Sequence, residues 1–176
     1  MSVNVSIRQF KGGFRKKHLA AVFEETGFPS GHLVLEITES LLMDDDVRFR
    51  DTLNDFRDLG VRLAVDDFGT GYSALSYLRE FPVDTLKIDR SFIQDIVENS
   101  NDRRLVEAIV VMAHGLDLGV VAEGVETAEQ EILLRGLNCD MVQGYFYGAP
   151  VSAAEITDLL ESSSLKAGGT KSAKMA

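Results

Sequence analysis

Short runs of β-branched and aliphatic residues alternate with amphipathic stretches along most of this chain. The runs predict six strands, at residues 3–6, 33–38, 61–66, 83–89, 119–123 and 139–145. Helical spacing of apolar residues predicts helices at residues 14–26, 46–59, 73–80, 91–116 (as one helix or two), 127–137 and 153–161. This alternation indicates an α/β fold with a parallel sheet, because only parallel strands need such long crossovers. A doubly wound sheet and a TIM barrel both remain possible at this point.

The composition favours one globular domain followed by a polar tail. The chain has 176 residues, of which 45% are hydrophobic, and this is enough to bury a sizeable core. Residues 162–176 are mostly Ser, Lys, Gly and Ala, with little to bury. We therefore expect a domain at residues 1–161 and a disordered tail at residues 162–176.

The charge and the cysteine content restrict the partners and the compartment. A formal charge of −10 disfavours binding to a nucleic-acid polymer or an anionic membrane surface. The single cysteine, Cys139, cannot form an intramolecular disulfide, and no stretch reaches the about 18 apolar residues of a membrane span. The first residues also lack the pattern of an export signal. These features predict a cytoplasmic protein that does not insert into membranes.

Polar side chains stand at or near the end of every predicted strand. In a parallel barrel the carboxyl ends of the strands meet at one rim, where polar residues form a site, whereas a doubly wound sheet would spread them along a crevice. Each residue taken alone has an ordinary explanation as a turn, cap or ion-paired residue, but their repetition at equivalent places favours a site. The residues are Asn4, Glu36, Asp66, Asp67, Lys87, Glu123 and Gln143.

Four of these groups are carboxylates, which would strongly raise one another's pKa values at one rim unless cations compensated them. Oxygen ligands without clustered His or Cys favour Mg²⁺ or Mn²⁺ over Zn²⁺. The adjacent Asp66 and Asp67 could serve two ions, as in two-metal phosphoryl chemistry.

The segment at residues 66–73, Asp-Asp-Phe-Gly-Thr-Gly-Tyr-Ser, contains the Asp-Phe-Gly sequence of protein kinases. No His-Arg-Asp loop and no phosphate-binding Gly-Lys-Ser/Thr loop accompanies it. We interpret it instead as a mobile loop whose glycines permit positive φ, directly after two candidate metal ligands.

Six motifs in order from residue 2 to about residue 160 closely resemble the EAL domain of cyclic di-GMP phosphodiesterases. The motifs are Val-Asn-Val-Ser (3–6), Leu-Glu-Ile-Thr-Glu-Ser (35–40), the 66–73 segment, Leu-Lys-Ile-Asp-Arg-Ser-Phe (86–92), Ala-Glu-Gly-Val-Glu-Thr (122–127) and Gln-Gly-Tyr (143–145). The resemblance implies a TIM-like barrel that hydrolyses one phosphodiester of cyclic di-GMP to give linear pGpG.

The resemblance also implies a role for each candidate residue. One metal ion would be held by Asn4, Glu36 and Asp66, and a second by Asp66, Asp67 and Glu123. Lys87 resembles the lysine that orients or activates the attacking water. Glu39 resembles the glutamate that anchors the loop at residues 68–73, and Gln143 resembles a group close to the substrate.

Compared with this family the barrel is incomplete. A TIM barrel has eight strands in about 250 residues, whereas six strands are predicted here, and Glu-Ala-Leu does not occur. In the family that motif supplies a glutamate ligand on the first strand, so we expect weak or lost hydrolysis. Missing strands would also leave open sheet edges, which a homodimer could cover. The alternatives are a non-catalytic module that binds cyclic di-GMP or a protein, and a fragment of a longer signalling protein.

Overall fold

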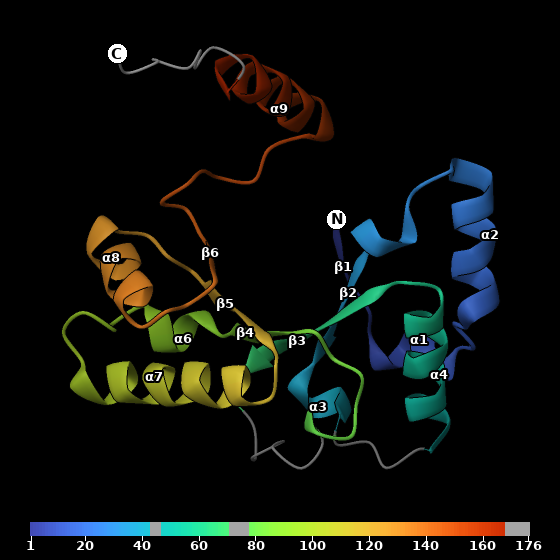
Figure 1. Cartoon of the computed structure of the whole chain (residues 1–176), viewed down its shortest axis with the longest axis horizontal. Coiled ribbons are helices and arrows are strands. Elements are labelled where there is room, and N and C mark those ends of the chain that lie inside the picture. The colour runs from blue at the N-terminus through green and yellow to red at the C-terminus, as the bar shows by residue number, and fades with distance from the viewer. Residues whose placement is uncertain (43–46, 71–77, 168–176) are drawn as a thin grey trace, which may run out of the picture.

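Every neighbouring pair of strands in the sheet is parallel, and the strands follow one another in chain order. The computed structural model describes residues 1–42, 47–70 and 78–167. Its strands curl into a half-barrel (Figure 1), which confirms the predicted incomplete TIM-like α/β fold. The strands are β1 (Ser2–Asn4), β2 (Val34–Thr38), β3 (Arg62–Phe68), β4 (Thr85–Ile88), β5 (Gly119–Glu123) and β6 (Met141–Gln143).

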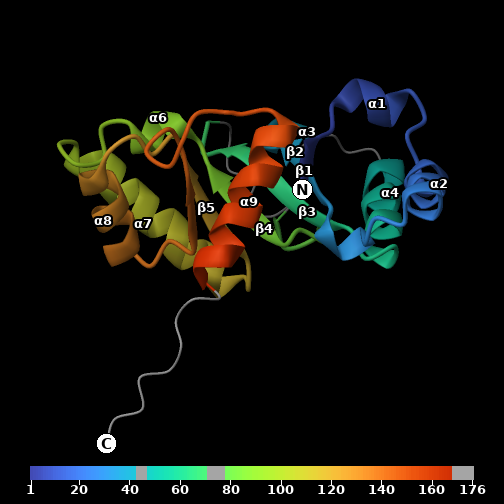
Figure 2. The ribbon, with the colours of Figure 1, turned by 90° about the horizontal axis from the view of Figure 1, so that it is seen from above.

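Helices flank the two halves of the sheet. In Figure 2 the helices α1, α2 and α4 lie on one side of the molecule and α6, α7 and α8 on the other. Within the described ranges no helix is long and apolar enough to cross a membrane. The helices are α1 (Ile7–Lys11), α2 (Lys16–Thr26), α3 (Glu39–Leu42), α4 (Val47–Asp58), α6 (Arg90–Ile93), α7 (Ser100–Gly115), α8 (Ala128–Gly136) and α9 (Ala153–Ala167), with a 3₁₀ turn at Ser30–His32.

Local hydrogen bonds explain where the elements depart from the predicted bounds. The first strand ends at Asn4 because the backbone N–H and the hydroxyl of Ser6 both donate to Gln9 Oε1 at 2.9 Å, which caps the unpredicted α1. The predicted segment 91–116 is two helices, and Asn99 Oδ1 caps the second through the Asn101 N–H at 2.9 Å. The helix α9 continues past residue 161 to Ala167, and most of the predicted helix 73–80 lies outside the described residues.

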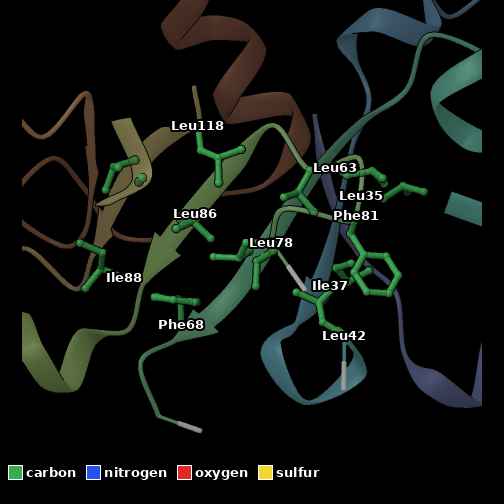
Figure 3. Close-up of a cluster of buried hydrophobic side chains, with 14 of the residues drawn as sticks. Leu35, Ile37, Leu42, Leu63, Phe68, Leu78, Phe81, Leu86, Ile88 and Leu118 are labelled. Atoms are coloured by element: carbon green, nitrogen blue, oxygen red, sulfur yellow. The ribbon is translucent and has the colours of Figure 1, made fainter. Parts of the chain in front are cut away.

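The hydrophobic core includes aliphatic side chains of the central strands, as Figure 3 shows. Leu35 and Ile37 of β2, Leu63 of β3 and Leu86 and Ile88 of β4 are at most 1% exposed. Alternate residues of a strand point to opposite faces, so the residues between these positions face the barrel interior. This alternation gives Glu36 and Lys87 a common direction.

One end of β5 is tied to α7 and to the start of β6 by a carboxylate. Asp140 Oδ2 accepts hydrogen bonds from the Val120 N–H at 2.8 Å and from His114 Nε2 at 2.9 Å. Burial would raise the pKa of Asp140, but the bonds from His114 and Val120 lower it below its ordinary value. His114 of α7 is thereby hydrogen-bonded to the residue that precedes β6.

Apolar side chains remain exposed at the two edges of the sheet and on the last helix. Val3 in β1 is 41% exposed and Met141 in β6 is 54% exposed. Figure 1 shows α9 standing apart from the strands, and its Ile156 and Leu160 are 47% and 66% exposed. Exposed apolar side chains at sheet edges are usually covered by another secondary-structure element or another chain.

Candidate functional site

The amine of Lys87 lies among three carboxylates that come from three other strands. Its Nζ is 2.7 Å from Glu123 Oε1, 2.8 Å from Glu36 Oε2 and 3.0 Å from Asp66 Oδ1. The four side chains are between 7% and 19% exposed. They belong to β2, β3, β4 and β5, whose parallel pairing brings their carboxyl ends to one rim. We call these four residues the Lys87 cluster.

The Lys87 cluster carries more negative than positive charge. Burial would lower the pKa of Lys87, but its interactions with the carboxylates of Glu123, Glu36 and Asp66 raise it above its ordinary value, so the amine is firmly protonated. Burial raises the pKa of Glu123, and the charges of Asp66 and Glu36 add to this effect, while Lys87 opposes it. One amine thus faces three carboxylates, and the rim attracts a further cation.

A β-bulge separates Asp66 from Asp67. The pairing of β3 with β4 shifts register between Val65 and Phe68, and Asp67 has a φ of 55°. Bulges of this kind redirect a side chain, and Asp67 is exposed while Asp66 joins the Lys87 cluster. The pKa of Asp67 is nevertheless raised, because neighbouring atoms partly desolvate its carboxylate and Asp66 and Asp89 add to this effect, against a lowering by Lys87.

Glu39 supports the turn that follows β3. Its side chain lies in the short helix α3, is 3% exposed, and accepts a hydrogen bond at Oε2 from the Gly69 N–H at 3.0 Å. The Thr70 hydroxyl closes the same turn by donating to the Asp67 carbonyl at 2.8 Å. Of the loop at residues 68–73 that Glu39 was expected to anchor, residues 71–73 lie outside the described part of the chain.

Asn4 and Gln143 occupy the two edges of the site. Asn4 pairs with Glu36 in the register of β1 and β2, and Gln143 pairs with Glu123 in the register of β5 and β6. Both residues are exposed. The structure therefore brings Glu36, Asp66, Lys87 and Glu123 into contact and places Asn4 and Gln143 beside them.

The donor set suits hard divalent cations, because every candidate ligand atom is an oxygen. Asp66 Oδ1 is buried and has no hydrogen-bond partner, since its 3.0 Å approach to Lys87 Nζ lacks hydrogen-bond geometry. In the described residues, however, no three acidic, His or Cys side chains already surround a common ion position. The Lys87 amine lies where the carboxylates converge.

Sequence reasoning overlooked the residues that support this rim from behind. Phe92 of α6 packs beside the turn after β3, and the buried Gln130 of α8 bonds to the segment after β5. The sequence does contain a pattern that could have identified Gln130: Thr127 and Gln130 form a Ser/Thr-x-x-Glu/Gln capping box, which marks the start of a helix.

Comparison with known proteins agrees with this geometry. The EAL domain pattern matches residues 1–150. The cyclic di-GMP phosphodiesterase NbdA of Pseudomonas aeruginosa is 47% identical over 137 residues, which are 78% of this chain and 18% of NbdA. The chain spans between 17% and 26% of the length of eight curated relatives that it matches.

Solved structures share the fold. PaMucR phosphodiesterase, in complex with c-di-GMP, superposes with a TM-score of 0.83 at 39% identity over 88% of this chain and 63% of its own. Klebsiella pneumoniae BlrP1, in a manganese and cy-diGMP complex, has a TM-score of 0.75 at 30% identity, over 82% of this chain and 37% of its own. A calcium complex of BlrP1 with cy-diGMP also matches. This chain belongs to the EAL domain family.

Proposed function

We propose that this chain is a metal-dependent phosphodiesterase domain that cuts one phosphodiester bond of cyclic di-GMP to give linear pGpG. The observation that carries the proposal is the Lys87 cluster, in which Glu36 of β2, Asp66 of β3 and Glu123 of β5 converge on the Lys87 amine of β4. The complexes of PaMucR and BlrP1 with the cyclic dinucleotide support this choice of substrate.

The proposed cofactors are two divalent cations, Mg²⁺ or Mn²⁺. Asn4, Glu36 and Asp66 would hold one ion, and Asp66, Asp67 and Glu123 the other. The all-oxygen donor set, the buried Asp66 Oδ1 that makes no hydrogen bond, and the manganese and calcium complexes of BlrP1 support this assignment. Bound ions of this type acidify a coordinated water and stabilise charge on phosphoryl oxygens.

The remaining residues act around that centre. Lys87 contributes a fixed positive charge beside the carboxylates, where it orients the attacking water and offsets charge on the phosphoryl group. Glu39 keeps the turn after β3 in one shape through the Gly69 N–H. Gln143, which is exposed at the end of β6, would contact the substrate from the edge of the rim.

Hydrolysis by these 176 residues is proposed to be weak. The chain contains no Glu-Ala-Leu sequence, and six strands are described where a complete barrel has eight. Asn4 is a neutral ligand, so the first ion would depend on only two carboxylates for charge compensation. The position of the Lys87 amine, in the middle of the cluster, favours the second candidate: a module that binds cyclic di-GMP or a protein without turnover.

Replacing Glu123 by glutamine is expected to lower the hydrolysis rate by about 100-fold or more, because it removes one negative ligand of the second ion. The measurement is pGpG release from cyclic di-GMP with Mn²⁺ or Mg²⁺, followed by chromatography, with chelated samples as blanks. Glu129→Gln is the matched control, since Glu129 is an exposed residue of α8 and should leave the rate unchanged.

The same experiment separates the two candidates. Cyclic di-GMP binding is measured in parallel in Ca²⁺ by calorimetry. Binding with no turnover by the unmodified chain would reject the enzyme and support the binding module. If the Glu123→Gln chain hydrolysed cyclic di-GMP as fast as the unmodified chain, the proposed set of metal ligands would be rejected.

We also propose that a second copy of the chain covers the open edges, giving a homodimer. The support is the exposure of Val3 in β1, Met141 in β6 and Ile156 and Leu160 in α9. Light scattering is expected to give twice the mass of the 19.4 kDa chain. A monomer with a sharp thermal transition would contradict the dimer.

A further inference from the structure

The ring of Phe92 packs against the turn that follows the Asp66 and Asp67 bulge. A Cβ built on Gly69 would lie 2.9 Å from Phe92 Cε2, so the ring edge closely approaches the backbone of this turn. Gly69 has a φ of +99°, and its N–H donates to Glu39 Oε2. The turn is thus held between the Glu39 carboxylate on one side and an aromatic ring on the other.

The same short helix, α6, also contacts the chain that leaves β5. Gly124 directly follows Glu123, and a Cβ there would lie 2.5 Å from Arg90 Cβ and 3.3 Å from Arg90 Cα. This approach involves the backbone and first side-chain atom of Arg90, so it cannot be relieved by moving the end of a flexible side chain. The helix α6 therefore stands between the exits of β3 and β5, which carry Asp66 and Glu123.

Both ends of α6 are tied down. At its start, Asp89 Oδ1 accepts hydrogen bonds from the Ser91 N–H at 3.0 Å and the Ser91 hydroxyl at 2.5 Å. At its end, Gln130 Nε2 donates to the Ile93 carbonyl at 3.1 Å and to the Gln94 carbonyl at 3.0 Å. Asp89 comes two residues after Lys87, so only Ile88 lies between the capped start of α6 and the Lys87 cluster.

Gln130 joins α6 to the segment after Gly124 as well. It is 5% exposed, and its Oε1 accepts hydrogen bonds from the Glu126 N–H at 2.8 Å and the Thr127 N–H at 3.1 Å. Both ends of this side-chain amide are therefore used within the protein. A buried amide with all of these bonds made specifies a single arrangement of the segments that it joins.

We infer that Phe92 and Gln130 are positioning residues that hold α6 between the exits of β3 and β5. We call this placement of α6 the wedge. The wedge keeps Asp66 and Glu123 on opposite sides of Lys87 at the separation that the site requires. Its effect on metal ions rests on the proposed function, whereas its effect on the turn at Gly69 does not. The two effects can therefore be measured separately.

The first test is amide hydrogen exchange at Gly69 in metal-free protein, measured by NMR. Phe92→Ala is expected to speed exchange of the Gly69 N–H by about 10-fold or more, since the turn loses the ring that closes it. Phe81→Ala is the matched control. Phe81 is buried at the other end of β4, where it packs against Phe49 with a ring-centroid distance of 5.8 Å.

Exchange is compared under conditions in which both variants remain folded, so that global stability does not set the Gly69 rate. Equal acceleration at Gly69 in Phe92→Ala and Phe81→Ala would overturn the wedge. Phe92→Leu, which keeps an apolar side chain, should recover part of the protection. If Phe92→Ala does not fold, the pair Phe92→Leu and Phe81→Leu makes the same comparison, with faster Gly69 exchange expected only in the former.

The second test is Mn²⁺ affinity, measured by electron paramagnetic resonance. We expect Phe92→Ala and Gln130→Glu to bind Mn²⁺ about 10-fold more weakly than the unmodified chain, because loss of a residue that orients metal ligands costs about this much. Phe81→Ala should bind it unchanged. Faster Gly69 exchange in Phe92→Ala without any Mn²⁺ binding to the unmodified chain would overturn the proposed function but support the wedge. Mn²⁺ binding that neither Phe92→Ala nor Gln130→Glu weakens would overturn the positioning role.

Discussion

Replacement of Lys87 by methionine is expected to destabilise the folded chain by about 3–5 kcal/mol at neutral pH, because removing one partner from a buried ion-pair network leaves uncompensated charges. Three carboxylates lie within 3.0 Å of the Lys87 amine, and none of the four side chains is more than 19% exposed. Methionine has nearly the side-chain volume of lysine, so the loss of stability measures the effect of removing the positive charge. Urea unfolding followed by circular dichroism measures the change.

Lys16→Met provides the control for this prediction. Lys16 Nζ pairs with Asp58 at 3.5 Å, and these side chains are 38% and 70% exposed, so the substitution should change stability by at most about 1 kcal/mol. Divalent cation should then stabilise Lys87→Met more than the unmodified chain, since the three carboxylates that lose the amine repel one another and a bound cation offsets this repulsion. A Lys87→Met chain as stable as Lys16→Met would show that the Lys87 cluster contributes no net stability.

Replacement of Gly144 by alanine is expected to cost about 3 kcal/mol or more and to disturb the exit of β6. A Cβ at this position would lie 2.1 Å from the Val125 carbonyl oxygen and 2.3 Å from the Val125 nitrogen. Both atoms are backbone, and both are in use, since the Val125 N–H donates to the Gln143 carbonyl and the Val125 carbonyl accepts from the Phe146 N–H, each at 3.0 Å. Thermal and urea unfolding give the size of the effect.

Gly136→Ala is the matched substitution. Gly136 ends α8, and a Cβ there would meet no atom within 4 Å. This change should leave stability unaltered or raise it by about 0.4–1 kcal/mol, because alanine restricts the unfolded chain. If both alanine variants unfolded at the same urea concentration, the close approach of Gly144 to Val125 would have no energetic consequence.

Strand positions and strand direction followed from local sequence, whereas the order of the strands in the sheet did not. Each of the six strands could be located because its aliphatic residues are flanked by amphipathic segments, and crossovers of that length permit only parallel neighbours. The polar residues at the strand ends could be identified for the same reason, since Glu36, Lys87 and Glu123 interrupt otherwise apolar runs. Short elements such as α1 and α3 could not, because so few residues carry no clear helical period.

The site shows where local patterns stop being informative. Asp66 and Asp67 are equivalent in the sequence, yet a bulge in the pairing of β3 with β4 places one in the Lys87 cluster and leaves the other exposed. Asn4 and Glu36 lie side by side in the register of β1 and β2, but Asn4 is exposed because β1 forms the edge of the sheet. Nothing in the sequence distinguishes Gly144 from other loop glycines, but in the structure a Cβ at this position would overlap the Val125 backbone.

By itself, therefore, the sequence determined parallel strands with long crossovers and polar residues near the strand ends, since period, crossover length and residue type are properties of neighbouring residues, and its motifs showed the resemblance to the EAL family. Only the tertiary structure decided that the Lys87 amine lies among three carboxylates and that α6 stands between the exits of β3 and β5. These contacts join residues from separate strands and helices. Their distances depend on sheet curvature, register and backbone approach, which no local pattern encodes.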